Sequence, residues 1–232
     1  MVYNWPLRPQ WLIPSHCQLC LAKDPSGLNL CRACHDDLPW LTLACPRCSL
    51  PLHYPGQLCG ACQHHPPIFD TGIALFHYAP PVDQLILQLK FAAGLHQARL
   101  FAALLGARLA KVPSPDCIIP VPLHPSRQRE RGFNQAIEIA RPLSQQLRCP
   151  LDIESCIRTR PTPPQSLLSG SQRRSNLRDA FALTRPLQAR HVALVDDVLT
   201  TGSTLNAVAK LLRKAGAERI DVWVCARTHR NA

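Results

Sequence analysis

Eight of the twelve cysteines form four Cys-x-x-Cys pairs, which begin at residues 17, 31, 45 and 59, each 14 residues after the last. A Cys-x-x-Cys turn directs two thiolates at one point, and two such turns supply the tetrahedral thiolate set that Zn²⁺ prefers. Four turns therefore predict two structural zinc sites. The predicted ligands are Cys17, Cys20, Cys31, Cys34, Cys45, Cys48, Cys59 and Cys62.

Two features of this array stay open at the level of sequence. Serial pairing, 17/20 with 31/34 and 45/48 with 59/62, is favoured because closing short loops costs the least entropy, and crossed pairing is the alternative. An iron–sulfur cluster is an alternative occupant, since four cysteines also hold iron.

Disulfides are disfavoured because no export signal precedes the array. The scattered remaining cysteines are expected to be small core residues: Cys117, Cys149, Cys156 and Cys225.

A second segment, VALVDDVLTTGSTL at residues 192–205, runs from an apolar strand through two aspartates into a turn and a helix. Small residues and a glycine before a helix allow consecutive backbone N–H groups to point at one phosphate. The predicted phosphate-binding residues are Thr200, Thr201, Gly202, Ser203 and Thr204. Asp196 and Asp197 would repel a phosphate, so they suit ribose hydroxyls or a hydrated Mg²⁺ that the ligand holds.

This segment resembles the phosphoribosyl pyrophosphate (PRPP) motif of type I phosphoribosyltransferases at every position of that motif. The resemblance implies that Asp196 and Asp197 contact the ribose hydroxyls and that residues 200–204 wrap the 5-phosphate. It also implies Mg²⁺ as a cofactor together with PRPP. No Walker A or G-x-G-x-x-G pattern is present, so nucleoside triphosphates and dinucleotides lack support as ligands.

Two arginine-rich segments fit a ligand that bears pyrophosphate. Arg127, Arg129 and Arg131 occupy alternate positions, so an extended loop would place them on one side, where they could contact phosphate oxygens. The segment 158–181 is dominated by proline, serine and arginine and is expected to form a mobile lid that shields the reacting centre from water. Either group could instead bind a nucleic-acid backbone.

Positive charge is concentrated outside the cysteine array. Residues 1–66 carry a formal charge of +1, so the rest of the 232-residue chain carries +10 of the total +11. Such a domain suits a polyanion, either a nucleic acid or a multiply phosphorylated small molecule. Two zinc-loaded thiolate cages would turn the first 66 residues net negative, which favours a structural or docking role for them.

Strand-like and helix-like segments alternate after residue 67. This pattern predicts an α/β fold with a mainly parallel sheet, flanking helices and a ligand site beyond the strand ends. The domains are predicted as a double zinc ribbon at 1–66 and a phosphoribosyltransferase-like domain at 67–232. Because neither a membrane span nor a signal peptide is evident, a cytoplasmic location is expected. The predicted strands are 71–79, 117–122, 151–157, 191–195 and 220–226, and the predicted helices are 82–91, 96–111, 133–148 and 203–215.

The ordered combination of the cysteine array, LHPSRQRERGFNQ, RTRPTPPQSLLSGSQRR and VALVDDVLTTGST resembles the ComF family. The GntX-like branch, implicated in the use of external DNA as a nutrient, is the most similar. The resemblance implies a double zinc ribbon joined to a phosphoribosyltransferase-like domain, and a role in competence and DNA uptake. It also implies a phosphate or pyrophosphate role for Lys90, which lies in LILQLKFAAG.

Three hypotheses follow from the residues and the resemblance. The first is a protein that binds a PRPP-type ligand and single-stranded DNA during DNA uptake or processing. The second is an active phosphoribosyltransferase, a pentosyl transferase that displaces pyrophosphate from PRPP in favour of an unknown acceptor. The third is an adaptor whose zinc ribbons recruit DNA-uptake or processing proteins. The first two are compatible with each other.

Overall fold

A computed structural model describes residues 15–24, 26–91, 94–160 and 180–229. The chain divides into two compact units, Met1–Leu38 and Pro39–Ala232. This division separates the first two Cys-x-x-Cys pairs from the last two. The predicted domain boundary after residue 66 stays a prediction about which part of the chain folds on its own.

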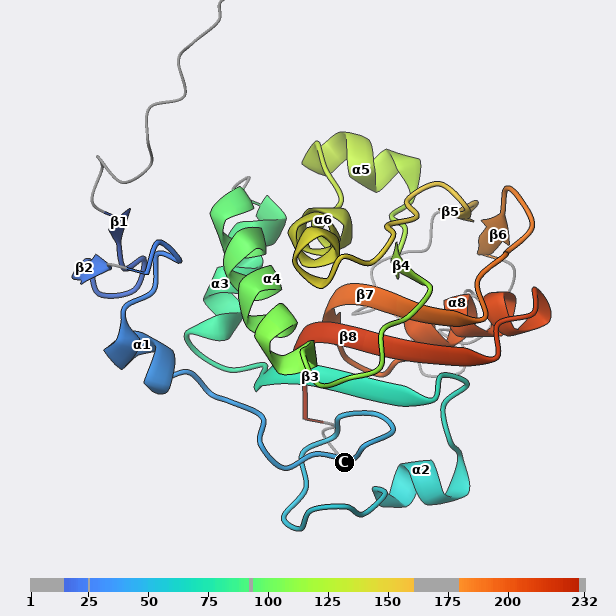
Figure 1. Ribbon diagram of the computed structural model, residues 1–232, viewed down its shortest axis with the longest axis horizontal. Helices are drawn as coiled ribbons and strands as arrows, with labels where there is room; N and C mark the ends of the chain where they lie inside the picture. Colours follow the sequence, from blue (N-terminus) through green and yellow to red (C-terminus); the bar gives the residue numbers. More distant parts are fainter. Residues whose placement is uncertain (1–14, 25, 92–93, 161–179, 230–232) are drawn as a thin grey trace, which may run out of the picture. The chain divides into compact units, whose positions relative to one another are not determined.

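Four parallel strands form the central sheet of the second unit in the order β3-β8-β7-β4 (Figure 1). The strands are β3 (Thr71–His77), β4 (Cys117–Pro120), β7 (His191–Leu199) and β8 (Arg219–Arg227). The run Val192–Val195 is buried throughout, as expected for a parallel strand with both faces covered. In the register of the sheet Arg227 pairs with both His77 and Leu199, so three strands end at one edge.

Helices cover both faces of this sheet. On one face lie α3 (Val82–Phe91), α4 (Leu95–Leu109) and α6 (Gln135–Leu147), with α4 packed on α6 (Figure 1). The buried side chains of α8 (Ser203–Lys214) share a core cluster with Val192 and Leu194 of β7. Since strand side chains alternate between faces, this cluster fixes the side of the sheet that α8 covers. The predicted parallel α/β architecture is confirmed.

Two short elements complete the phosphoribosyltransferase-like part. Helix α5 (Pro125–Arg131) follows β4, and β5 (Cys156–Arg158) pairs antiparallel with β6 (Phe181–Leu183) in a separate small sheet. The sequence interpretation treated α5 as a loop and did not predict β6. The predicted lid at 158–181 lies largely outside the described residues, and the structure describes only its two ends.

In the first unit, β1 (Ser15–His16) pairs antiparallel with β2 (Lys23–Asp24), and α1 (Arg32–Asp36) follows. The Cys17 and Cys20 pair lies in the connection between the two strands. Asp24 is buried and accepts hydrogen bonds from the backbone N–H groups of Ser26 and Leu30, at 2.9 and 3.2 Å. These bonds hold the chain between the first and second cysteine pairs.

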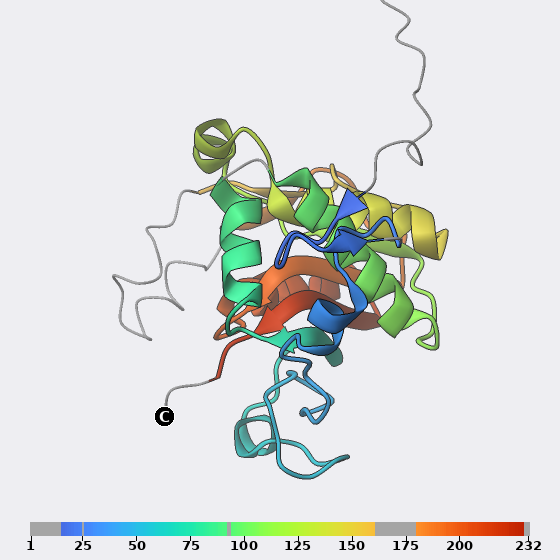
Figure 2. The ribbon, with the colours of Figure 1, turned by 90° about the vertical axis from the view of Figure 1, so that its left-hand side faces the viewer.

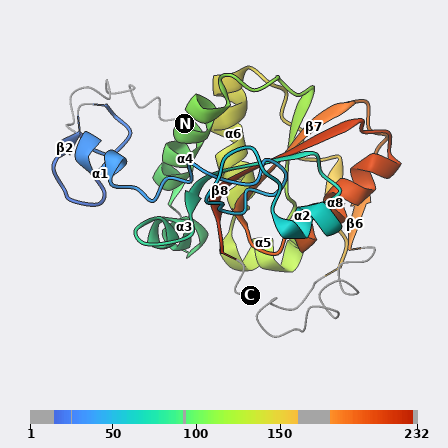
Figure 3. The same ribbon diagram turned by 90° about the horizontal axis from the view of Figure 1, so that it is seen from below.

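The second half of the cysteine array belongs to the second unit and lies against the sheet, on the side away from α4 (Figure 2). It contains α2 (Gly60–His64), and the segment from Pro39 crosses the sheet in the view from below (Figure 3). The Leu41 N–H donates to the Leu75 carbonyl at 2.8 Å, and the Gly72 N–H donates to the Pro46 carbonyl at 3.2 Å. Backbone hydrogen bonds thus join this segment to β3.

Candidate functional site

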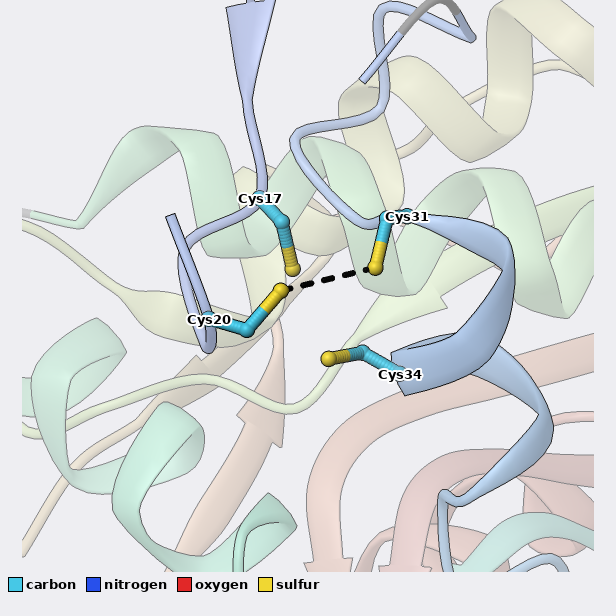
Figure 4. A group of neighbouring side chains, drawn as sticks. All are labelled: Cys17, Cys20, Cys31 and Cys34. Atoms are coloured by element: carbon cyan, nitrogen blue, oxygen red, sulfur yellow. Dashed lines mark hydrogen bonds between the residues drawn. The ribbon is translucent and has the colours of Figure 1, made fainter. Parts of the chain in front are cut away.

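Each half of the cysteine array brings four sulfur atoms together. All four Sγ atoms lie within 4.8 Å of one another in each group, and in the first group all four side chains point toward one centre (Figure 4). The two four-cysteine groups are Cys17, Cys20, Cys31 and Cys34, and Cys45, Cys48, Cys59 and Cys62. The serial pairing favoured from the sequence is therefore confirmed.

The sulfur spacing fits a tetrahedral metal ion. Cys20 Sγ lies 3.6 Å from Cys31 Sγ, and Cys48 Sγ lies 3.6 Å from Cys59 Sγ. A tetrahedral site with Zn–S bonds of about 2.3 Å requires sulfurs about 3.8 Å apart, whereas a disulfide requires about 2.05 Å. Burial alone would raise the pKa of Cys45, but backbone N–H groups of Cys59, Cys48 and Arg47 lower it to about 7. Such donors favour the thiolate that binds metal.

The two four-cysteine groups share one local design. In the first, the Cys17 N–H donates to the Ala22 carbonyl at 2.8 Å, and in the second the Cys45 N–H donates to the Leu50 carbonyl at 2.8 Å. Cys31 and Cys59 each immediately precede a five-residue helix, α1 or α2. The uniform 14-residue spacing therefore conceals a structural repeat of twice that length, a turn followed by a short helix.

The aspartate pair lies inside β7 rather than after it. The predicted strand ended at Val195, but the ladder to β8 continues to Leu199. Asp196 Oδ1 accepts from the Asp197 N–H at 2.9 Å, and Asp197 Oδ1 accepts from the Val198 N–H at 2.8 Å. These bonds fix the orientation of both carboxylates. The ladder to β8 fixes the backbone that carries them, just before the turn.

Lys90 joins this pair from the end of α3. Its Nζ lies 2.9 Å from Asp197 Oδ2, and the two side chains are only 21% and 6% exposed. Burial alone would lower the pKa of Lys90, but the adjacent Asp197 carboxylate raises it above the ordinary value. Burial and the neighbouring Asp197 raise the pKa of Asp196 well above its ordinary value. Two carboxylates and one ammonium thus share a site that is largely shielded from water.

The turn after β7 has the backbone conformation that a phosphate-binding loop needs. Gly202, which immediately precedes α8, adopts the left-handed conformation with φ 76°. The Thr201 and Ser203 hydroxyl oxygens lie 2.9 Å apart, and the Ser203 N–H reaches Thr201 Oγ1 only at 3.4 Å. The Asn206 N–H donates to the Gly202 carbonyl at 2.8 Å, so Gly202 closes the first turn of α8. The positive end of the α8 dipole therefore lies at this turn.

The arginines after β4 are arranged differently from the prediction. An extended loop was expected to place Arg127, Arg129 and Arg131 on one side, but these residues lie in α5. Successive alternate positions in a helix are about 200° apart, so Arg129 points away from the other two. The guanidinium of Arg131 lies 5.1 Å from the ring centroid of Phe91, and its Nη1 donates to Gln135 Oε1 at 3.1 Å.

Sequence reasoning did not single out two further arginines at the site. Arg158 ends β5 and lies 5.4 Å from the Phe181 ring centroid. Burial and the charge of Arg127 lower the pKa of Arg158, and the charge of Asp196 opposes this lowering. Arg227 is buried at the end of β8, and its Nη1 donates to the Leu199 carbonyl at 2.8 Å. Arg158 begins the arginine-rich segment that the sequence interpretation treated as a lid, whereas Arg227 is brought to the site by strand pairing, which no local pattern encodes.

Within the described residues, no helix has the length and apolar character needed to cross a bilayer. Of the four cysteines outside the array, Cys149, Cys156 and Cys225 are buried and Cys117 is half-buried. Burial raises the pKa of Cys156 to about 12, which is consistent with the predicted role as small core residues.

Comparison with known proteins matches both parts of the chain. The double zinc ribbon domain model matches residues 9–63, and the phosphoribosyl transferase domain model matches residues 134–231. A purine phosphoribosyltransferase from Pyrococcus horikoshii is similar over 55% of this chain and 80% of that protein, at 21% identity and a TM-score of 0.34. That similarity is too distant to support a conclusion about function.

Relatives match over nearly the whole chain. DNA utilization protein YhgH from Escherichia coli O157:H7 is 40% identical over 225 residues, which cover 93% of this chain and 98% of the relative. Competence protein F from Haemophilus influenzae is 39% identical over 223 residues, covering 91% and 95%. Competence protein ComFC from Streptococcus pneumoniae is 27% identical over 154 residues, covering 66% and 67%. With its two four-cysteine groups and its phosphoribosyltransferase-type fold, this chain belongs to the ComF family of competence and DNA utilization proteins.

Proposed function

We propose that this protein binds PRPP together with Mg²⁺ through the turn after β7. The observation that carries the proposal is the juxtaposition of the start of α8, a left-handed Gly202 and an aspartate pair held in β7. Residues 200–204 bind the 5-phosphate through their backbone N–H groups and hydroxyls. Asp196 and Asp197 bind the ribose hydroxyls, and Lys90 balances their charge.

The residues present also fit Mg²⁺. Asp196 and Asp197 supply carboxylate oxygens, the ligands that Mg²⁺ prefers. Asp197 Oδ2 is buried against Lys90, so the half-buried Asp196 is the more accessible of the two. When bound with PRPP, Mg²⁺ supplies charge neutralisation for the pyrophosphate. Arg158, whose pKa responds to the charges of Arg127 and Asp196, supplies further positive charge.

Calorimetric titration of PRPP with Mg²⁺ into the full chain tests this binding. Wild type is expected to bind, and Asp196→Asn/Asp197→Asn is expected to reduce affinity at least a hundredfold, because both contacts to the ribose hydroxyls lose a charged acceptor. Asp83→Asn is the matched control, since Asp83 lies on α3 at the end opposite Lys90. Equal affinity in wild type and the double variant would contradict the proposal.

Single-stranded DNA is the second proposed ligand, and DNA uptake or processing inside the cell is the proposed setting. The support is the +10 charge beyond residue 66 together with family membership. On α5, Arg129 is exposed and points away from Arg127, so it suits a DNA phosphate, whereas Arg127 is half-buried and interacts electrostatically with Arg158. Different ligands are therefore assigned to the two arginines.

Fluorescence anisotropy with labelled single-stranded DNA at several salt concentrations tests this assignment. Arg129→Ala is expected to weaken binding and to reduce the salt dependence by about one released ion. Arg127→Ala is the matched comparison and is expected to lower PRPP affinity more than DNA affinity. DNA affinity that is indifferent to salt would count against the assignment.

An active phosphoribosyltransferase is a second candidate function that the same site supports. Oriented arginines and Mg²⁺ would stabilise the charge of departing pyrophosphate. The test is pyrophosphate release from PRPP across a panel of purine and pyrimidine bases, with the double asparagine variant as control. If pyrophosphate release does not depend on any of these bases, the transferase function is contradicted and only the binding role stands.

A docking role for the first four-cysteine group is compatible with either function. It lies in a unit separate from the phosphate loop, so partner capture and PRPP binding should be separable. Cys17→Ser/Cys20→Ser is expected to abolish capture of a DNA-uptake partner and to spare PRPP binding. Loss of both together would contradict the separation.

A further inference from the structure

The two four-cysteine groups differ in their relation to the phosphate loop, although their local structures repeat. The first group belongs to the unit Met1–Leu38, and the second to the unit that contains β7 and α8. Only in the second unit, therefore, do the described contacts reveal how a cysteine turn meets the loop.

Arg227 connects the turn of the second group to the start of the loop. Its Nε donates to the Cys48 carbonyl at 3.0 Å, and its Nη1 donates to the Leu199 and Thr200 carbonyls at 2.8 and 2.5 Å. The side chain is 2% exposed. One planar guanidinium therefore bridges the backbone of a metal-ligand residue and the two residues at which β7 enters the phosphate loop.

A second connection reaches the helix that follows the loop. Past the Cys59 and Cys62 pair, the Ile68 N–H donates to Asn206 Oδ1 at 2.8 Å. Asn206 lies in the first turn of α8, and its own N–H closes the helix onto the Gly202 carbonyl at 2.8 Å. The second cysteine segment thus contacts the loop region on both sides of Gly202.

The cysteine turn itself lies close against β3. A Cβ on Gly72 of β3 would lie 3.0 Å from the Arg47 carbonyl oxygen and 3.3 Å from Cys48 Cα. Arg47 also donates to the Pro67 carbonyl at 3.3 Å. A turn packed this closely, with two of its residues acting as metal ligands, can transmit the position of the metal to Arg227.

We infer that metal in the second four-cysteine group holds the phosphate loop in its anion-binding conformation through Arg227. The inference rests on the proposed binding of PRPP. Arg227 acts as a positioning residue, because it contacts the loop backbone rather than the ligand. By linkage, if metal in the second group strengthens PRPP binding, PRPP must increase the affinity for that metal by the same factor.

Retention of zinc by the ligand is the direct test. The full chain carrying Cys17→Ser/Cys20→Ser holds zinc only in the second group, so all zinc released to a chelator comes from there. PRPP with Mg²⁺ is expected to tighten zinc retention in this protein about tenfold, which is the coupling expected from one hydrogen bond of a charged donor. Adding Arg227→Lys should remove this effect of PRPP on zinc retention. One ammonium cannot reach both the Cys48 carbonyl and the Leu199 and Thr200 carbonyls.

Arg219→Lys is the matched control. Arg219 begins β8, the strand that Arg227 ends, and it is engaged with Asp221 through Nε and Nη2 at 3.1 Å each. It should leave the tenfold protection unchanged. If PRPP binds by calorimetry but does not alter zinc retention, or if Arg219→Lys and Arg227→Lys behave alike, the inference is wrong while the proposed function stands.

A measurement without ligand separates the two possible failures. Amide ¹⁵N chemical shifts of residues 200–204 should change when the second zinc is removed, and should change far less in the Arg227→Lys protein. If PRPP never binds but these shifts occur, the proposed function fails and the coupling stands. If the chemical shifts of residues 200–204 do not change when the second zinc is removed, the coupling is wrong, whether or not PRPP binds.

Discussion

The ion pair between Lys90 and Asp197 gives the sharpest prediction about how the site is built. Replacing Lys90 with methionine removes the ammonium, keeps the apolar stem, and leaves two adjacent carboxylates without their nearby cation. At 2.9 Å and an effective dielectric constant of about 20, the lost attraction is about 6 kcal/mol. Methionine avoids the free-energy cost of burying an ammonium, which offsets part of the lost attraction.

A net loss of about 3 kcal/mol in the free energy of unfolding at pH 7 is therefore expected for Lys90→Met. This is the lower end of the range for breaking a buried pair, because the lysine is 21% exposed. In a chain of this size it corresponds to a fall of roughly 6 to 12 °C in the melting temperature. Urea unfolding followed by circular dichroism measures it. Lys210→Met, on the exposed side of α8, is the matched control and should change stability by less than about 0.5 kcal/mol.

The loss should depend on pH with a definite sign. Burial and Asp197 already raise the pKa of Asp196, and Lys90 lowers it, so removing Lys90 raises it further. A carboxyl group whose pKa is raised by folding stabilises the fold below its unfolded pKa, and that contribution is lost as pH rises through the folded pKa. The deficit of Lys90→Met should therefore be largest at pH 7 and smaller near pH 4.

Two results would refute this reasoning. One is a Lys90→Met protein whose stability at pH 7 lies within about 0.5 kcal/mol of wild type. The other is a deficit of equal size at pH 4.5 and pH 7. The double variant Lys90→Met/Asp197→Asn should recover most of the lost stability, because it removes the uncompensated charge as well.

Three further predictions concern the same site and the metal groups. Asp196→Asn should raise the unfolding free energy of the ligand-free protein by about 1 kcal/mol at pH 7, since it relieves the like-charge contact with Asp197. The same change should abolish PRPP binding. Urea unfolding shows whether the stability gain vanishes toward pH 4, as the raised pKa of Asp196 requires. Gly202→Ala should cost about 1–2 kcal/mol and lower phosphate affinity at least tenfold by calorimetry, because φ is 76° and the new Cβ would lie 3.4 Å from Leu199 Cδ1. Unchanged stability would contradict the left-handed turn. Zinc removal should expose the amides of residues 15–38 to rapid hydrogen exchange, because Cys17 is fully buried and few other residues in the described part of this unit belong to a core. Retained protection would show that this unit folds without metal.

Local signals identified most of the elements. The helix predicted at 82–91 coincides with α3, and the helix predicted at 203–215 is one residue longer than α8. Strong apolar periodicity and the turn chemistry of Gly202 explain this agreement. The arginine-rich α5 was missed because it has no buried residue to produce a periodic apolar pattern.

The sequence by itself determined the chemical groups of this protein. The fixed spacing of eight cysteines implied two metal groups, because each Cys-x-x-Cys pair is a local pattern that recurs every 14 residues. A strand followed by DDVLTTGST implied an anion site, which is also a local pattern. Only the tertiary structure decided which groups meet: Lys90 with Asp197, Arg158 with the Phe181 ring, and Arg227 with the Cys48 carbonyl. These partners lie tens to hundreds of residues apart, and strand order and register, which no local pattern encodes, bring them together.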